Sequence, residues 1–295
     1  MTANNILVLG YGEMGHAMEY LLGSRHRLSF WARELDTDLE QLAAAAEIVL
    51  FCLPVNPHAE VLSRIRPRLQ PGCLCLSIAK GLDEQGRSAA QIFAEQLPDS
   101  AYALLYGPMI SEEIRAGRPA FAEVGTPQDR VFERVRELYR GSRLYLERSD
   151  DIAGISWSVI LKNVYAMAFG MADELRLGDN MRGYLAVAAL HELDRIAERM
   201  GGQPRSPFHL AGLGDLITTA TSEDSHHHEL GRRLARGETD QISGEGVHTL
   251  QMVERHGLFD TADYPLFRLI GELVKNPADL EQRLLAHVER VFSMP

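Results

Sequence analysis

Residues 4–15 read "NNILVLGYGEMG". An apolar run is followed by a segment that contains three glycines, Gly10, Gly12 and Gly15. The run has the composition of a buried strand, and "HAMEYLL", which follows it, is typical of a helix. In such a strand–turn–helix unit the first glycine permits the tight turn, the second lets the backbone approach a pyrophosphate, and the third lets helix pack on strand. The helix N-terminus supplies N–H donors for the anion. The stretch therefore predicts a dinucleotide-binding unit.

Outward from this stretch, strand-like and helix-like segments alternate as far as residue 149. The strand-like runs lie at residues 4–10, 27–33, 47–54, 73–80, 102–108 and 119–126. Strands rich in Val, Ile and Leu that alternate with helices indicate an α/β fold with a parallel sheet and helices on both faces. We expect a doubly wound Rossmann-type domain over residues 1–149. The strand signals then fade, so residues 150–295 are predicted to form an all-helical second domain.

Residues 152–172 form a long apolar run with one charged side chain, Lys162, near its middle. A membrane span of this length would place that lysine in the bilayer at a cost of roughly 2.5–3.5 kcal/mol. We therefore expect a buried core helix and no membrane span. Lysine is rare here: of 30 basic residues only Lys80, Lys162 and Lys275 are lysines. A lysine amine can exchange its proton where an arginine cannot, so these positions are candidates for acid–base chemistry. The simpler interpretations are chance and a lysine tip that reaches water.

Composition and charge indicate which partners, cysteine functions and cellular location to expect. The net charge is −11, which argues against a nucleic-acid partner. Cys52, Cys73 and Cys75 lie in apolar strand-like runs without the spacing of a metal or redox motif. The N-terminal residues show no basic segment before the first strand. We expect a cytoplasmic protein with reduced thiols.

The second strand ends in Arg33, followed by Glu34. An acidic residue at this position favours the ribose hydroxyl of NAD, whereas an arginine suits the 2′-phosphate of NADP. The sequence is therefore compatible with either NAD or NADP as the cofactor. Glu13, inside the glycine-rich loop, places a carboxylate near the expected pyrophosphate, which is unfavourable unless the side chain points away.

Further motifs follow in a fixed order along the chain. They are "GYGEMG" at 10–15, "FWAR" at 30–33, "LP" at 53–54, "AKGLD" at 79–83, "GP" at 107–108, "LKNVYAMAFGMADELRLGDN" at 161–180, "GLGDLITTATS" at 212–222 and "GEGVHT" at 244–249. In this series the chain resembles the bacterial type of NAD(P)-dependent glycerol-3-phosphate dehydrogenases, nearly from end to end. The resemblance implies a Rossmann-type domain, a helical domain and an active site between them. It also implies hydride transfer between NAD or NADP and C2 of glycerol 3-phosphate or dihydroxyacetone phosphate.

The resemblance assigns site residues one position at a time. Catalytic roles fall on Lys162 as acid/base, on Lys80 and on Asp215. Cofactor contacts fall on Gly10, Gly12, Glu13, Met14, Gly15, Arg33, Lys80, Ser111 and Glu245. Substrate contacts fall on Lys80, Gly107, Met109, Lys162, Asp215, Thr219, Ser225, His226 and His227. Two of the three lysines land on catalytic positions, in agreement with their rarity. An ammonium held against a carbonyl oxygen stabilises the charge that develops there and donates a proton.

Residues 222–231, "SEDSHHHELG", depart from the family. Where relatives carry a serine–arginine–asparagine run that holds the substrate phosphate, this chain keeps Ser225 but has His226 and His227. Glu13 and Met109 likewise replace small polar residues. His228 is interpreted as a bystander.

Three hypotheses follow from these changes: a glycerol-3-phosphate dehydrogenase whose histidines hold phosphate, a dehydrogenase for another hydroxy acid or polyol, and a nucleotide-binding paralogue without turnover. We favour them in this order. Consecutive helical residues point about 100° apart, so three histidines in a row do not predict a metal site. The apolar helical half suggests a homodimer.

Overall fold

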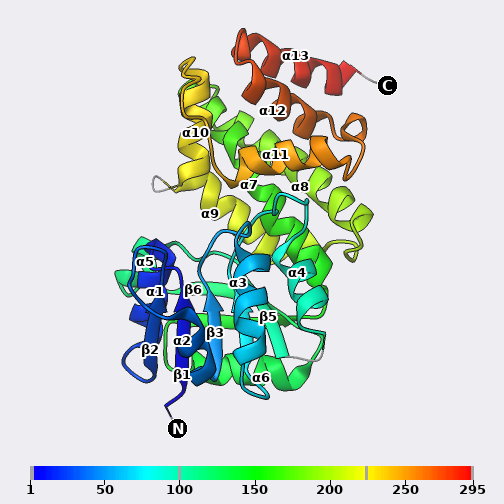
Figure 1. Cartoon of the computed structure of the whole chain (residues 1–295). Helices are drawn as coiled ribbons and strands as arrows, with labels where there is room; N and C mark the ends of the chain where they lie inside the picture. Colours follow the sequence, from blue (N-terminus) through cyan, green and yellow to red (C-terminus); the bar gives the residue numbers. More distant parts are fainter. Residues whose placement is uncertain (1–2, 99–100, 223–224, 294–295) are drawn as a thin grey trace. The chain divides into compact units, whose positions relative to one another are not determined.

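The computed structural model describes residues 3–98, 101–222 and 225–293. The chain divides into two compact units, Met1–Ser156 and Trp157–Pro295, coloured blue to green and green to red in Figure 1. The division falls within the long helix α7 (Ile152–Glu174), a few residues after the boundary expected at 149/150. The chain thus leaves the first unit through a continuous helix.

The first unit is built on a seven-stranded sheet. Its strands are β1 (Asn5–Leu9), β2 (Arg27–Trp31), β3 (Ile48–Phe51), β4 (Leu74–Ser77), β5 (Ala101–Tyr106), β6 (Ala120–Gly125) and β7 (Leu144–Ser149). The order across the sheet is β2-β1-β3-β4-β5-β6-β7. All neighbours are parallel except β5 and β6, which pair antiparallel. The expected fold class is confirmed.

The sequence predicted two details of this sheet incorrectly. It predicted a parallel sheet, but β6, which follows β5 after a segment that contains α5, pairs antiparallel with β5. It also missed β7, a strand at the edge of the sheet in which only Leu144 is buried and the last three residues are polar. A half-exposed edge strand carries polar side chains and lacks the continuous apolar run of a buried strand.

Helices cover both faces of the sheet. They are α1 (Glu13–Leu22), α2 (Leu39–Ala45), α3 (His58–Ile65), α4 (Ala89–Gln96), α5 (Ser111–Arg115) and α6 (Asp129–Leu138). Alternate strand residues such as Ile6 and Val8 pack against α1, α5 and α6 in one apolar cluster. The intervening residues face the other way, where Phe51 of β3 meets His58 of α3 and Phe93 of α4. Because successive side chains of a strand point to opposite faces of the sheet, each strand contributes apolar residues to the packing on both faces.

The second unit contains helices only, within the part of the chain that the structure describes. After α7 come α8 (Gly178–Arg199), α9 (Asp215–Thr221), α10 (His226–Ala235), α11 (Glu245–His256), α12 (Pro265–Lys275) and α13 (Leu280–Ser293). Helix α7 is long and apolar enough to cross a membrane by length and composition, yet 89% of its most apolar window is buried inside the protein. That burial is typical of a core helix.

Two glycines allow α7 and α10 to pack backbone against backbone. A Cβ added to Gly170 of α7 would lie 1.9 Å from the carbonyl oxygen of His228, and one added to Gly231 of α10 would lie 2.0 Å from that of Met167. Neither position has room for a side chain. This close contact fixes the first turns of α10 against α7.

Helix α12 is capped from a neighbouring helix. The buried carboxylate of Glu192 in α8 accepts hydrogen bonds from the backbone N–H groups of Leu266 and Phe267 and from the hydroxyl of Tyr165. Burial raises the pKa of Glu192, and the three donors oppose that shift. The carboxylate satisfies N–H groups that a helix start otherwise leaves without partners.

Candidate active site

The three glycines of the loop after β1 differ in the space around their α-carbons. Gly10 has φ of +98°, and a Cβ there would lie 2.8 Å from the carbonyl oxygen of Cys52. A Cβ on Gly15 would lie 2.4 Å from the carbonyl oxygen of Gly10, so the third glycine lets α1 pack on the loop. Gly12 has open space where its side chain would be, and as the residue before α1 it supplies no side-chain cap to that helix. The N-terminus of α1 is thus accessible to an anion.

A cavity of about 820 Å³ opens beside this loop, which we call the switch-point cavity. It is lined by Gly10, Tyr11, Gly12, Trp31, Ala32, Arg33, Glu34, Leu35, Cys52, Leu53, Pro54, Asn56, Pro57 and Glu60. These residues follow the carboxyl ends of β1, β2 and β3. Strand order reverses between β1 and β3, where doubly wound sheets bind nucleotides. The cavity contains Arg33 with two carboxylates, Glu34 and Glu60.

Glu13, the first residue of α1, forms an ion pair with Arg115. Its Oε2 atom accepts a hydrogen bond of 2.7 Å from Nη2 of Arg115 in α5. Both side chains are exposed, to 62% and 40% respectively. Met14, beside Glu13, is partly buried and packs on the apolar cluster of the first unit. The carboxylate that looked unfavourable from the sequence is therefore held by a cation.

The residues after β5 lie in the interior of the first unit. Gly107 has no room for a side chain, since a Cβ there would lie 2.6 Å from the carbonyl oxygen of Phe121. Met109 is buried in the apolar cluster under the sheet. Ser111 is the buried first residue of α5, and its hydroxyl donates to Glu112 at 2.8 Å. The structure thus gives Met109 a packing role in this unit.

Lys80 follows β4, and its Nζ atom donates to the carbonyl oxygen of Gly107 at 3.2 Å. The segment before it is held by the buried imidazole of His58. Nδ1 of His58 lies 2.8 Å from the carbonyl oxygen of Pro54, and Nε2 lies 2.9 Å from the hydroxyl of Ser77. Burial lowers the pKa of His58 to about 4, so the ring is neutral: Nδ1 donates and Nε2 accepts. The Ser77 hydroxyl also accepts from the backbone N–H of Ala79.

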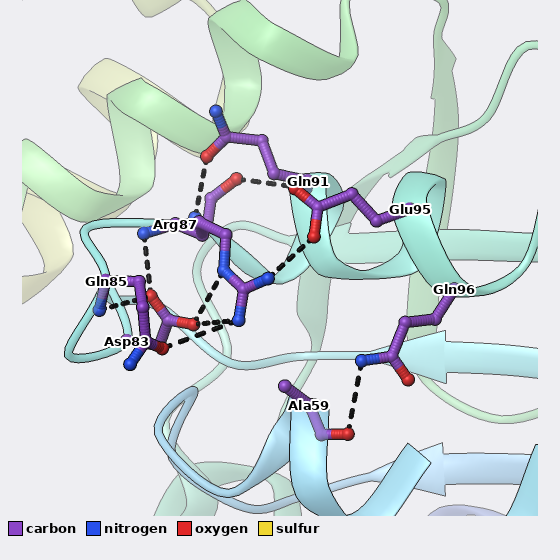
Figure 2. Close-up of polar contacts among 8 residues, drawn as sticks. Ala59, Asp83, Gln85, Arg87, Gln91, Glu95 and Gln96 are labelled. Atoms are coloured by element: carbon purple, nitrogen blue, oxygen red, sulfur yellow. Dashed lines mark hydrogen bonds and ion pairs between the residues drawn. The ribbon is translucent and has the colours of Figure 1, made fainter. Parts of the chain in front are cut away.

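The loop after Lys80 is fixed by a buried aspartate, shown in Figure 2. Oδ1 of Asp83 accepts from the backbone N–H groups of Gln85 and Arg87, and its Oδ2 pairs with the guanidinium of Arg87 at 2.8 Å. The same guanidinium reaches Glu95 in α4 at 2.6 Å. Ser88 and Gln91 then form a capping box at the start of α4. Lys80 therefore sits between two tightly bonded segments.

In the second unit, Lys162 and Asp215 form a buried ion pair. Nζ of Lys162, in the middle of α7, lies 3.3 Å from Oδ2 of Asp215, the first residue of α9, and both side chains are at most 6% exposed. Lys162 also donates to the hydroxyl of Thr219, one turn further along α9. A buried ammonium needs such partners because its desolvation is costly. The three residues that the sequence placed in one site are brought together.

The start of α11 reaches the same part of α7. Oε2 of Glu245 accepts from Nδ2 of Asn163, next to Lys162, at 3.3 Å. A Cβ on Gly246 would lie 2.7 Å from the carbonyl oxygen of Asn163, so α11 also needs glycine to approach α7. Glu245 is thereby placed beside the lysine helix.

The three histidines point to three different partners. Nε2 of His226 lies 3.0 Å from the carbonyl oxygen of Ser243, and Nε2 of His227 accepts from the backbone N–H of Gly246 at 3.3 Å. His228 is buried, with Nε2 2.8 Å from Asp173 of α7. The hydroxyl of Ser225 caps α10 by accepting from the backbone N–H of His228. No group of three or more metal-ligating side chains occurs among residues 3–98, 101–222 and 225–293.

A glycine-rich loop at the switch point of a doubly wound sheet, in a chain that also holds a buried lysine–aspartate pair, is typical of nucleotide-dependent dehydrogenases. Comparisons with known proteins agree. The family models described as the N-terminus and the C-terminus of NAD-dependent glycerol-3-phosphate dehydrogenase match residues 34–131 and 151–284.

Individual relatives extend over nearly the whole chain. A glycerol-3-phosphate dehydrogenase [NAD(P)+] of Synechococcus sp. (strain JA-3-3Ab) is 31% identical over 297 residues, which cover 97% of this chain and 95% of that protein. One of Acaryochloris marina is 29% identical and covers 98% and 97%. The crystal structure of the Coxiella burnetii glycerol-3-phosphate dehydrogenase superposes with a TM-score of 0.86 at 23% identity, covering 97% of this chain and 99% of that one. The chain belongs to the NAD(P)+-dependent glycerol-3-phosphate dehydrogenase family, whose members are oxidoreductases that act on a CH–OH group.

Several residues near these positions were not predicted from the sequence. Asn163 was quoted only as part of the motif at 161–180 and was given no role, although it bonds Glu245. Glu60 lines the switch-point cavity and belongs to none of the motifs, whereas Tyr11 and Trp31 line it and were quoted only as parts of "GYGEMG" and "FWAR". No sequence pattern identified Arg115 as a partner of Glu13, because the two residues are remote in sequence and only the fold brings them together.

Proposed function

We propose that this chain transfers a hydride between NAD or NADP and C2 of dihydroxyacetone phosphate or glycerol 3-phosphate. The buried Lys162–Asp215 pair carries the proposal, because an ammonium fixed in this way can act on the oxygen of a substrate at C2. Family membership supports the reaction.

The residues of the first unit fit a dinucleotide. Gly12 leaves the N-terminus of α1 open to a pyrophosphate, and the switch-point cavity is large enough for a nucleotide half. Arg33 lines the cavity, where it suits a 2′-phosphate, and the adjacent Glu34 suits a ribose hydroxyl. The nicotinamide supplies the hydride in reduction and accepts it in oxidation. The protein's own part is to bind, orient and exchange the proton.

Lys162 is the group that we propose exchanges this proton. As the ketone is reduced, negative charge grows on its oxygen, and the ammonium stabilises that charge and donates the proton. Asp215 holds the ammonium in place through the ion pair, and the hydroxyl of Thr219 accepts a hydrogen bond that orients the ammonium. Lys80, whose position is fixed by its bond to Gly107, provides a second cation for an anionic substrate.

A second candidate is a dehydrogenase for a phosphate-free hydroxy acid or polyol, and the histidines favour it. Nε2 of His226 and Nε2 of His227 bond the main chain at Ser243 and Gly246, so these rings offer less to a phosphate than the fork of an arginine. We place this candidate second because the lysine, aspartate and glycine positions of the family are all present.

The test is a reductase assay with NADH and NADPH on dihydroxyacetone phosphate, dihydroxyacetone and a panel of ketoacids. We expect turnover of the phosphorylated ketose. The Lys162→Met substitution should lower kcat at least a hundredfold while the Kd for the dinucleotide stays within about twofold. Lys275→Met is the matched control, since Lys275 lies on the surface and pairs with Glu254. Full activity of Lys162→Met would refute the role of the lysine.

The same assay separates the two candidates. Turnover of a phosphate-free substrate without turnover of dihydroxyacetone phosphate would establish the second. In the double variant His226→Arg with His227→Asn, the KM for the phosphorylated substrate should fall about tenfold if these positions set phosphate affinity. An unchanged KM would exclude them as the specificity positions.

The proposal extends to a homodimer in the cytoplasm. Exposed apolar side chains on the second unit, including Val187 of α8 and Phe292 of α13, support self-association. Sedimentation equilibrium measures the mass in solution and decides between monomer and dimer.

A further inference from the structure

The phosphate end of the proposed cofactor site has an unusual charge. Glu13 occupies the first turn of α1, the turn whose free N–H groups would bind the pyrophosphate. A carboxylate at this position benefits from the helix dipole when the site is empty, but it repels a bound phosphate. A residue that removes this repulsion would therefore matter for cofactor binding.

The rest of the site offers little compensation. Among the residues that line the switch-point cavity, Arg33 is outnumbered by Glu34 and Glu60. Arg33 follows β2, on the side that receives the ribose. The chain as a whole carries a net charge of −11. An incoming dinucleotide, itself an anion, thus meets a cavity with more carboxylates than cations, in a chain of negative net charge.

Arg115 forms an ion pair with Glu13, the carboxylate that would repel the phosphates. Its Nη2 atom lies 2.7 Å from Oε2 of Glu13, a distance typical of a strong charge-assisted hydrogen bond. Both side chains are exposed, and exposed ion pairs contribute little to folding stability. The pair therefore has little value as a structural bond, whereas its effect on the potential at the N-terminus of α1 is direct.

We propose that Arg115 is a positioning residue of the cofactor site, which holds and neutralises the Glu13 carboxylate so that the phosphates of a dinucleotide can bind at the N-terminus of α1. The inference rests on the proposed function, because it requires a dinucleotide at this site. Arg115 acts through Glu13, so its contribution exists only while Glu13 is present. That dependence separates this role from a direct contact between Arg115 and the phosphate.

A double-mutant cycle tests the inference. The Kd for NADH and NADPH is measured by fluorescence titration of the full-length chain for wild type, Arg115→Ala, Glu13→Ser and the double variant. An uncompensated carboxylate at the first turn should raise the Kd of Arg115→Ala about tenfold at low salt. The increase should shrink at about 0.5 M salt, because screening weakens exposed charges. Glu13→Ser should bind more tightly than wild type, and the double variant should return to within about threefold of it.

Arg118→Ala is the matched control. Arg118 forms an exposed ion pair with Glu113, at 2.9 Å, just after α5. Its loss removes one positive charge from the same region without freeing Glu13, so the Kd should not change. Thermal melting of all variants should stay within a few degrees of wild type, since both ion pairs are exposed.

The outcomes separate the alternatives. A Kd of Arg115→Ala equal to that of wild type overturns the inference. A double variant that binds as weakly as Arg115→Ala also overturns it, because Arg115 then contacts the cofactor itself. If the wild-type chain binds neither dinucleotide, the proposed function fails, and the inference fails with it.

Discussion

Acidification should destabilise the first unit through a single buried imidazole, that of His58. The ring is fully buried between Phe51 and Phe93, donates to the carbonyl oxygen of Pro54 and accepts from the hydroxyl of Ser77. Protonation would add a second donor where the serine hydroxyl already donates, and it would bury a charge. Burial accordingly lowers the pKa of His58 to about 4, from an ordinary value of 6.5.

The size of the effect follows from this difference. Between the two pKa values the unfolded chain binds a proton that the folded chain does not, so stability is lost as the pH falls below 6.5. From about pH 7.5 to about pH 5, the loss from this one group is about 2 kcal/mol. The full difference is reached only below the folded value, near pH 4.

The assay is urea unfolding at both pH values, followed by the fluorescence of Trp31. The chain has two tryptophans, and a Trp157→Phe background leaves only the one in the first unit. In that background, His58→Phe should be less stable at about pH 7.5, because Ser77 loses its acceptor, but should lose about 2 kcal/mol less on acidification.

The control is His191→Phe, which removes an exposed histidine of α8 and should leave the pH-dependent loss of the first unit unchanged. An equal loss in His58→Phe and in its background would refute the reasoning, since the buried imidazole could then not be the group that gains the proton.

Two further predictions concern the second unit. Gly170→Ala places a Cβ 1.9 Å from the backbone of α10 and should lower the free energy of unfolding by at least about 3 kcal/mol, whereas Gly183→Ala, in open space on α8, should be neutral or raise it by up to about 1 kcal/mol; denaturant unfolding checks both. Glu192→Ala leaves three donors unpaired and should cost about 3 kcal/mol, and Glu192→Gln, which keeps one acceptor oxygen, about half of that. Equal losses for the two Glu192 variants would contradict the capping role.

Much of the fold could be predicted because it depends on local patterns. Apolar runs with a period of two, separated by helical segments, indicate a sheet covered on both faces, and the glycines at 10, 12 and 15 mark the turn after β1. The local sequence of β7 carries a weaker signal, because only Leu144 is buried and the strand ends in three polar residues, Glu147, Arg148 and Ser149. Its place in the sheet depends on pairing with β6, which is a tertiary contact.

For the site, the sequence by itself determined which residue types are present: the glycine-rich loop, a lysine in an apolar helix, an aspartate at 215, and histidines where the family has an arginine and an asparagine. It could not determine what each charge faces. Tertiary structure decided that Lys162 meets Asp215, that the three histidines bond three separate partners, and that Arg115 holds Glu13. The physical reason is that dihedral preferences and periodicity act between neighbours in the chain, whereas ion pairs form between side chains that only the packing of distant helices brings within a few ångströms of each other.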